Sequence, residues 1–132
     1  MQDHFKVVKD YLQKLHYDIT HENTREGIFM ISKESEGIKN MILGVAPPIL
    51  IMEQHICNIK NKSETVYRNL LQKNRDILHG AFVLDETGEK VIFRDTLQIA
   101  NLDLNELEGS LNSIGILLGE YSEQIINFSR YS

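Results

Sequence analysis

His55 and Cys57 carry two side chains that bind transition metals, an imidazole and a thiol, only two residues apart. On a strand this spacing would put both on one face, where they could supply two metal ligands. Two ligands do not complete a site, and no C-x-x-C or H-x-x-x-H motif accompanies them. His21-Glu22 likewise lacks the second histidine of a zincin helix. We therefore expect no metal centre and no bound cofactor.

An acidic segment that contains a glycine, Asp85-Glu86-Thr87-Gly88-Glu89-Lys90, could bind calcium, cradle a phosphate or simply reverse the chain. A calcium loop with Gly88 at its sixth position needs acids at positions one and five and a glutamate at twelve, but Val83, Thr87 and Arg94 stand there. A phosphate-binding P-loop needs Gly-Lys-Ser/Thr, whereas an acid follows this glycine. The segment is therefore expected to be the turn of a β-hairpin, in which Gly88 adopts a positive φ.

The serines and histidines form no recognisable catalytic set. Ser110 follows Gly109 but lacks the flanking pattern of a nucleophile elbow. An enzyme would need a pocket that gathers His55, His79 or Asp95, which lie far apart in the sequence. We therefore predict no catalytic residues and no enzymatic activity.

Composition narrows the remaining functions. Fourteen basic and nineteen acidic side chains give a net charge of -5, which disfavours nucleic acid as a partner because phosphates would be repelled. A single cysteine excludes an intramolecular disulfide and suits a reducing compartment. The most apolar run, residues 41–52, is too short to cross a bilayer and is broken by Pro47-Pro48. We expect a cytoplasmic protein without a membrane segment.

Hydrophobic periodicity predicts the elements that would position these residues. Apolar side chains at spacings of three and four indicate a helix over the first sixteen residues, a second from Ser63 to about Asn74, and a long third helix. Asp103 and Glu106 have the spacing of a capping box at the start of the third. Extended patterns predict strands over residues 17–23, 27–33, 38–46 and 49–55, followed by the two strands of the hairpin.

Strands that cluster in sequence favour an antiparallel sheet, so the predicted class is α+β, in the order α-β-β-β(-β)-α-β-β-α. Helices with one apolar stripe each are expected to cover one face of the sheet. We find no linker, repeat or low-complexity tract, and therefore expect residues 1–132 to form a single domain. Pro47-Pro48 should mark a bend or a sheet edge, because proline cannot donate to a strand ladder.

Pairing Asp85 with Lys90 fixes the register of the hairpin. Apolar residues then face one another on one side of the sheet, while mostly polar residues fill the other. The apolar pairs are Leu84 with Val91, Phe82 with Phe93, and Leu78 with Leu97. Asp95 is the exception, since it falls on the apolar side opposite Gly80. It either bonds backbone amides near the strand edge or is a buried functional carboxylate.

The strands between residues 27 and 52 are apolar on both faces, so one face needs a cover other than the helices. A second copy of the chain, a client segment, or further cover from the helices and the bent strand would each provide it. The expected partner-binding residues are Met41, Leu43, Ile49, Ile51, Gly115 and Gly119. The two glycines stand one turn apart, where they permit close packing either on the chain's own sheet or across a dimer.

Residues 64–130 resemble the YbjN family, which is related in fold to the class I type III secretion chaperones (Tir chaperone-like domains). The matching features, in order, are Val66-Tyr67-Arg68-Asn69-Leu70-Leu71-Gln72-Lys73-Asn74, Gly80-Ala81-Phe82, the Asp85-to-Lys90 turn, Val91 to Arg94, and a leucine-rich helix that opens at Asp103. The resemblance implies a small α+β domain, commonly dimeric, that binds other proteins without cofactor or catalysis.

We therefore expect a chaperone-like, protein-binding homodimer. The alternative is a small-ligand sensor or regulatory domain with a pocket between the long C-terminal helix and the sheet.

Overall fold

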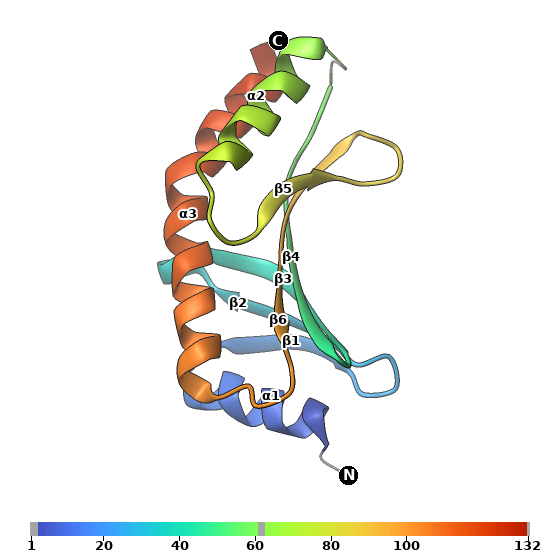
Figure 1. The fold of residues 1–132 in the computed structure, drawn as a ribbon, viewed down its shortest axis with the longest axis vertical. Helices are drawn as coiled ribbons and strands as arrows, with labels where there is room; N and C mark the ends of the chain where they lie inside the picture. Colours follow the sequence, from blue (N-terminus) through green and yellow to red (C-terminus); the bar gives the residue numbers. More distant parts are fainter. Residues whose placement is uncertain (1–2, 61–62, 132) are drawn as a thin grey trace.

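The computed structural model describes residues 3–60 and 63–131, and in the last helix it describes side chains as far as Asn127. Three helices and six strands alternate in the order expected from the sequence, and Figure 1 shows their arrangement. The elements are α1 (His4–Lys14), β1 (Asp18–Asn23), β2 (Ile28–Lys33), β3 (Ile38–Ala46), β4 (Ile49–Asn58), α2 (Glu64–Arg75), β5 (Ala81–Leu84), β6 (Lys90–Gln98) and α3 (Leu104–Tyr131), with a short 3-10 turn, η1 (Glu34–Glu36), before β3.

All six strands form one antiparallel sheet in the order β1-β2-β3-β4-β6-β5. The α+β prediction is confirmed. Pro47-Pro48 forms the tight turn between β3 and β4, whose flanking residues Ala46 and Ile49 pair directly. β4 runs three residues beyond the predicted strand, so it and β6 form the long central ladder that joins the two ends of the molecule.

Each helix begins at a side-chain cap, and the caps of α2 and α3 are the ones that the sequence predicts. Asp3, Ser63 and Asp103 each accept a hydrogen bond from the backbone N–H three residues further on, at 3.2, 3.4 and 2.8 Å respectively. Such bonds satisfy amides that the first turn of a helix otherwise leaves without a partner. α3 spans 28 residues, about 42 Å at 1.5 Å per residue, and extends along the whole sheet.

We call the side of the sheet that the helices cover the inner face. Figure 1 shows α2 and α3 to the left of β4 and β6 and α1 below them, with none of the described helices on the right. Phe5 of α1 stacks on Phe29 with ring centroids 4.1 Å apart, and α3 adds a row of buried aliphatic side chains. The largest fully buried side chains are Phe29, Phe93, Leu12, Ile31, Ile38, Met41, Leu43, Leu50, Met52, Leu107, Leu111 and Ile125.

The hairpin of β5 and β6 has the predicted register. Phe82 pairs with Phe93 and Leu84 with Val91, and the two phenyl rings meet edge to face at 5.3 Å. Asp85 N–H donates to the Lys90 carbonyl at 3.1 Å, which closes the predicted four-residue loop.

The Asp85 carboxylate organises that loop from within. Its Oδ1 accepts the backbone N–H groups of Lys90 at 3.1 Å and Glu89 at 3.2 Å, and the Thr87 hydroxyl donates to it at 2.9 Å. These bonds, the one from Lys90 first, hold the pKa of Asp85 below its ordinary value. Gly88 takes a φ of 74°, as its place in the turn requires. The acidic segment therefore binds its own backbone.

The predicted pairing of Leu78 with Leu97 is wrong. β5 begins only at Ala81, and Leu78 is 91% exposed. The chain leaves the ladder at Gly80, which has a φ of 81° and passes so close to Phe93 that an added Cβ would lie 2.6 Å from the ring. Residues 95–98 of β6 consequently pair only with β4, and their other edge is left open by β5.

Candidate functional site

The outer face of the sheet, opposite the helices, carries a patch of partly buried aliphatic side chains. Alternation along the strands places every second residue there, and their cross-strand pairs bring them together: Met30 with Ile42, and Ile28 beside Gly44 and Ile51. We call the following residues the outer-face patch: Ile28, Met30, Ile42, Ile49, Ile51, Val83 and Ile92. An apolar face without a helical cover is typical of a contact surface.

A hollow of about 700 Å³ lies on this side, where β4 extends beyond the end of β3. Its apolar lining includes Met30, Ile42 and Ile92, and Ile126 of α3 closes one side. Its polar lining residues are Lys39, Asn40, Glu53, Gln54, His55 and Ser122, and Glu53 is paired with Arg94 at 3.8 Å across the strands. The hollow therefore offers apolar contact together with polar groups that a partner has to satisfy.

The predicted partner-binding residues separate into two groups. Met41 and Leu43 lie on the inner face with no exposed surface, so in this structure they belong to the core. Ile49 and Ile51 lie on the outer face and are partly buried. The prediction that both faces of these strands are apolar is thereby borne out in the structure, although sequence alone did not show which face the helices cover.

Gly115 and Gly119 also differ. An added Cβ at Gly115 would lie 2.0 Å from the Glu36 carbonyl oxygen, because α3 and the turn after η1 pack backbone to backbone there. Gly37, on the other side of this contact, has a φ of 84°. Gly119 is exposed and has no atom within 4 Å of an added Cβ. Close packing on the chain's own elements therefore explains Gly115 but not Gly119.

The candidate metal ligands do not converge. The β4 register shifts between His55 and Cys57, so the regular alternation that would place them on one face is broken. His55 Nε2 lies 2.8 Å from the Asn58 side-chain oxygen. Within residues 3–60 and 63–131, no group of three potential metal-ligating side chains comes together. The buried polar residue Gln54 has a structural role. Its side-chain oxygen accepts the backbone N–H of Lys39, and its side-chain nitrogen donates to the carbonyl of Gly37.

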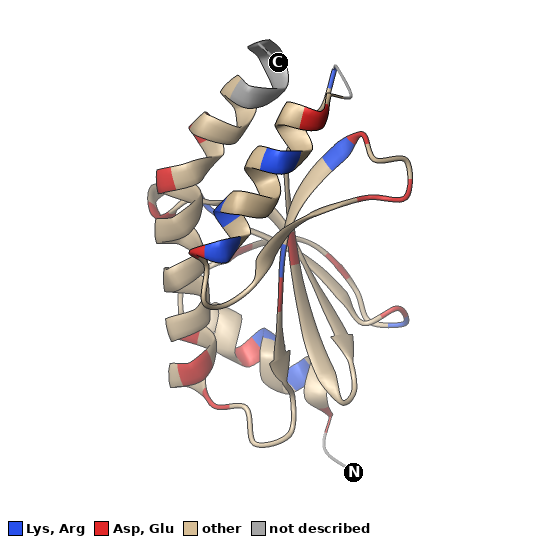
Figure 2. Cartoon of the chain, turned by 45° about the horizontal axis from the view of Figure 1, so that its top comes forward, with Lys and Arg blue, Asp and Glu red and all other residues tan. Residues whose placement is uncertain are grey.

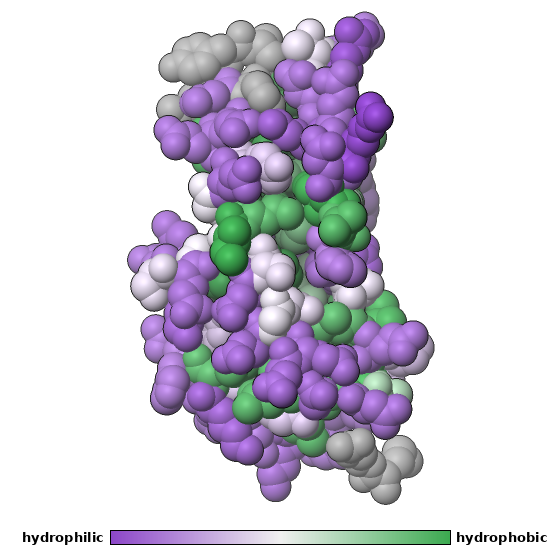
Figure 3. Space-filling view, turned by 60° about the vertical axis from the view of Figure 1, so that its left-hand side comes forward, coloured by the Kyte–Doolittle hydropathy of each residue, from purple (hydrophilic) through white to green (hydrophobic). Residues whose placement is uncertain are grey.

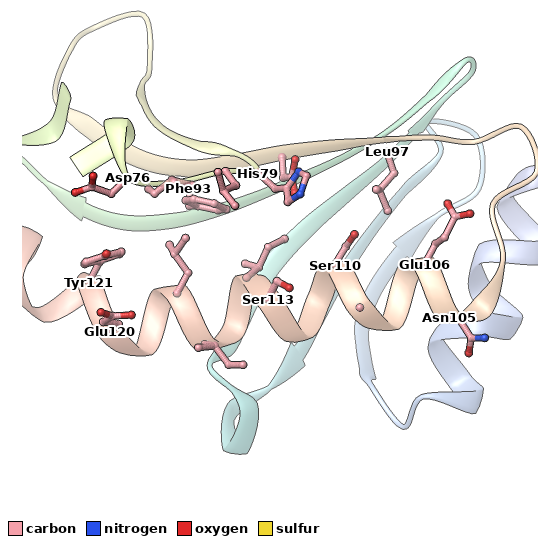
Figure 4. A pocket seen from close by; sticks show the side chains of 17 residues that line it. Asp76, His79, Phe93, Leu97, Asn105, Glu106, Ser110, Ser113, Glu120 and Tyr121 are labelled. Carbon is pink, nitrogen blue, oxygen red and sulfur yellow. The ribbon is translucent and has the colours of Figure 1, made fainter. Parts of the chain in front are cut away.

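A second uncovered surface is a groove of about 680 Å³ between α3 and β6, which we call the waist groove. Figure 3 shows an apolar area at the narrowest part of the molecule, between two hydrophilic halves. In Figure 4, His79, Phe93 and Leu97 lie on one wall, while Glu106, Ser110, Ser113 and Tyr121 face them from α3. Leu78 and Ile116 also line it and are 91% and 73% exposed, so the groove is an open apolar surface.

The waist groove also accounts for Asp95, the acid that the hairpin register places on the apolar side of the sheet. Asp95 lines the groove, and its Oδ1 accepts the N–H of Thr96 at 2.8 Å on the stretch that β5 leaves open. The predicted bond to an amide near the strand edge is confirmed.

Three further acids line the groove, namely Asp76, Glu106 and Glu120, and none of the lining residues is Lys or Arg. A cation approaches from one end, where Lys73 Nζ lies 4.9 Å from the ring centroid of Tyr121. The groove lies where the alternative prediction placed a pocket, between the long C-terminal helix and the sheet. Most of its lining residues were not predicted, because its walls come from three separate segments: the loop before β5, β6 and α3. The available signal was Ile116, an apolar residue that lies outside the buried stripe of α3 formed by Leu107, Leu111, Ile114 and Leu118.

Known structures share this fold at low sequence identity. YbjN from E. coli matches with a TM-score of 0.67 and 11% identity, over 90% of this chain and 92% of that one. A chain of the ExsC–ExsE complex matches with a TM-score of 0.65 and 17% identity, over 97% of this chain and 95% of that one. The Yersinia pestis type III secretion chaperone SycH, solved with a fragment of YscM2, matches with a TM-score of 0.60 and 15% identity, over 88% and 99%.

Sequence comparison assigns the family. No curated protein sequence matches the chain. In the part of the chain that the structure describes, no helix is long and apolar enough to span a bilayer. The CesT_Tir_1 family model matches residues 1–131, nearly the whole sequence. The chain therefore belongs to the CesT_Tir_1 family of type III secretion chaperones.

Proposed function

We propose that this chain is a non-enzymatic, chaperone-like domain that binds segments of other proteins and acts as a homodimer in the cytoplasm. It would work as one domain and without a cofactor. The observation that carries the proposal is the outer-face patch, a set of partly buried aliphatic side chains on the side of the sheet opposite the helices. Membership of a chaperone family supports the same use, and ExsC and SycH were each solved with a protein partner.

The chemistry of the patch suits a protein segment better than a metabolite. Its side chains are aliphatic, and the charged pair Glu53–Arg94 is satisfied within the sheet. Burial of such side chains contributes about 25 cal/mol for each Å² removed from water, without requiring particular hydrogen-bond partners. A small ligand needs a few polar groups that converge on it, whereas the patch itself consists of aliphatic side chains spread over several strands. Protein binding is therefore favoured over the sensor alternative.

Substitution within the patch tests the proposal. Ile51→Asp places a charge at the centre of the outer face, where its neighbours are Gly44 on β3 and Thr96 on β6. Asn112→Asp adds the same charge at an exposed site on α3 and serves as the matched control. A partner would be isolated from the source cell with the wild-type protein, purified, and titrated calorimetrically against both variants.

We expect Ile51→Asp to weaken that affinity by about tenfold or more, because a carboxylate buried against the partner loses its hydration. Asn112→Asp should bind as the wild type does. Thermal unfolding of each variant shows whether the fold is retained. Equal affinity for wild type and a folded Ile51→Asp protein would contradict the assignment of this face.

A further inference from the structure

The sheet opens between β3 and β4, beside the outer-face patch. The ladder of these two strands ends at the pair of Ile42 with Glu53, although β3 begins at Ile38 and β4 continues to Asn58. Figure 1 shows that the start of β3 lies close to α3, while β4 continues towards α2. The hollow of about 700 Å³ lies at this opening, and we call it the sheet hollow.

A β-bulge on β3 brings two neighbouring residues to the sheet hollow. Over this stretch β3 contains one residue more than β2, its partner in the ladder. Ile38 and Met41 both belong to the core, although strict alternation would place residues three positions apart on opposite faces. The extra residue lets Lys39 as well as Asn40 line the hollow, whereas strict alternation from Met41 would have turned Lys39 to the inner face. Asn40 has a φ of 49°, and its N–H donates to Ser32 Oγ at 2.9 Å, which holds the bulge.

A second β-bulge, on β4, borders the same hollow. His55 pairs with Ile92 and Cys57 pairs with Val91, so Ile56 is the extra residue of β4. Both His55 and Ile56 line the hollow. Bulges commonly turn side chains towards functional sites, and here two of them on adjacent strands add residues to one hollow.

The sheet hollow combines an aliphatic floor with one cation that has no acidic partner. Of the lining residues that the structure describes, Glu53 alone is acidic, and Arg94 pairs with it at 3.8 Å. Lys39 is exposed, and among the described residues no acidic side chain pairs with its ammonium group. The charge that remains for a partner to pair is therefore positive. The apolar lining residues are Met30, Ile42, Ile56, Ile92 and Ile126.

The charge of the whole chain limits how acidic such a partner can be. The net charge is -5, and Figure 2 shows acidic residues at several places on α3 and around the hairpin loop. A highly acidic segment would be repelled at long range, so recognition of a carboxylate at Lys39 depends on close contact. A segment with one acid beside large apolar residues matches both the hollow and the rest of the surface.

We propose that the sheet hollow is a specificity subsite for a protein segment that carries an acidic residue next to large apolar residues. The apolar side chains of the segment pack on Met30, Ile42 and Ile92, and its carboxylate pairs with the ammonium group of Lys39. The inference rests on the protein binding of the proposed function and names the class of segment that the outer face selects.

Reversal of the charge at Lys39 tests the subsite. A displayed library of random peptides would be selected against the wild-type protein, and an enriched peptide would be synthesised and titrated calorimetrically. We expect the enriched peptides to share a carboxylate beside large apolar residues. Lys39→Glu should weaken binding of the peptide by about tenfold, because two acids would then face each other. Lys14→Glu makes the same change of charge at an exposed site on α1 and should bind as the wild type does.

Exchange of charge on the peptide identifies the pair of groups. Replacement of the peptide's acid by lysine should weaken binding to the wild type and restore binding to Lys39→Glu, which a purely structural role of Lys39 would not produce. Ile92→Asp tests the floor of the hollow and should weaken binding by about tenfold or more, because the new carboxylate loses its hydration under the peptide. Thermal unfolding of each variant shows whether the fold is retained.

Several outcomes would overturn the inference. Equal affinity of the peptide for wild type, Lys14→Glu and Lys39→Glu would do so, as would enrichment of basic peptides or of none above background. A free fatty acid that bound the hollow as tightly as the peptide would assign it to a small amphiphile instead. The partner isolated for the proposed function separates the two proposals. If Ile51→Asp weakens its binding and Lys39→Glu does not, the outer-face patch remains the binding surface and the acidic subsite is wrong; if neither does, both proposals fail.

Discussion

The inner and outer faces of the central sheet are made of the same kinds of residue, yet only one of them is covered. Leu43 and Ile42 are neighbours on β3, and their side chains point to opposite sides of the sheet. Leu43 has no exposed surface, whereas Ile42 is only partly buried by its neighbours within the sheet. The difference comes from α1 and α3, which pack on one side. Apolar content alone therefore does not separate core from contact surface.

The largest effect is expected from truncation on the inner face. Leu43→Ala should lower the free energy of unfolding by about 3 kcal/mol, because it leaves a cavity among fully buried side chains. Ile42→Ala is the matched control on the outer face and should cost roughly 1 kcal/mol, since no cavity forms where no layer lies above. Urea unfolding of both variants measures the difference. Equal losses at the two positions would mean that the outer face is as tightly covered as the inner one.

The same contrast between inward and outward positions recurs along α3. Gly115→Ala should destabilise by about 2 kcal/mol, because the new Cβ collides with the Glu36 carbonyl oxygen and α3 must move off the turn. Gly119→Ala, one turn further on, should stabilise by up to about 1 kcal/mol through helix propensity alone. Thermal unfolding monitored by circular dichroism compares the two. A stabilised Gly115→Ala variant would show that this backbone contact is looser than the structure indicates.

A third test concerns the pKa of Tyr17, a buried residue of the core on the inner face. Tyr17 is buried between α1 and β1, with Lys33 Nζ 5.0 Å from its ring centroid. Burial, together with Glu36 and Glu108, raises the pKa of its phenol from 10.0 to about 12. The neutral phenol is thus favoured in the folded state, and the associated stability is complete below pH 10 and lost as the pH rises towards 12.

Tyr17→Phe should therefore show a shallower fall in stability with alkaline pH, with a difference that approaches roughly 2 kcal/mol. Urea unfolding of wild type and variant at steps above pH 9 provides the measurement. Parallel curves for the two proteins would indicate that the phenol ionises as readily when folded as when unfolded.

Local sequence patterns predicted two helix caps and the hairpin pairing, because the residues that interact there lie close together in the chain. The caps at Ser63 and Asp103 and the pairing of Phe82 with Phe93 each depend on residues at most eleven positions apart. The predicted pairing of Leu78 with Leu97 was wrong, because the close approach of Gly80 to Phe93 ends the strand. The contact between Gly80 and Phe93 depends on the path of the chain from α2 to β5, and no local sequence pattern predicts that path.

The candidate site was less predictable than the fold, since it depends on which face α3 covers. Apolar alternation placed Met41, Leu43, Ile49 and Ile51 on strands, but the two sides are equivalent by sequence. A pocket between the long C-terminal helix and the sheet was the alternative prediction, but most residues that line the waist groove could not be predicted, for another reason. Leu78 is separated from Ile116 by 38 positions, and both come together only through the length of β6 and the start of α3.

The smallest effect is expected at the exposed end of the hairpin, far from any layer of packing. The amides of Lys90 and Glu89 lower the pKa of Asp85 by bonding its ionised form. The stability that follows is present above the ordinary carboxyl pKa and is lost as the pH falls through the lowered value. Asp85→Asn keeps an acceptor oxygen but cannot titrate, so its unfolding midpoint should change less than that of wild type below about pH 4. Glu86→Gln, in the same loop, should retain the wild-type acid dependence. If Asp85→Asn follows the wild-type curve instead, the turn holds its shape without the ionised carboxylate, and Gly88 alone directs it.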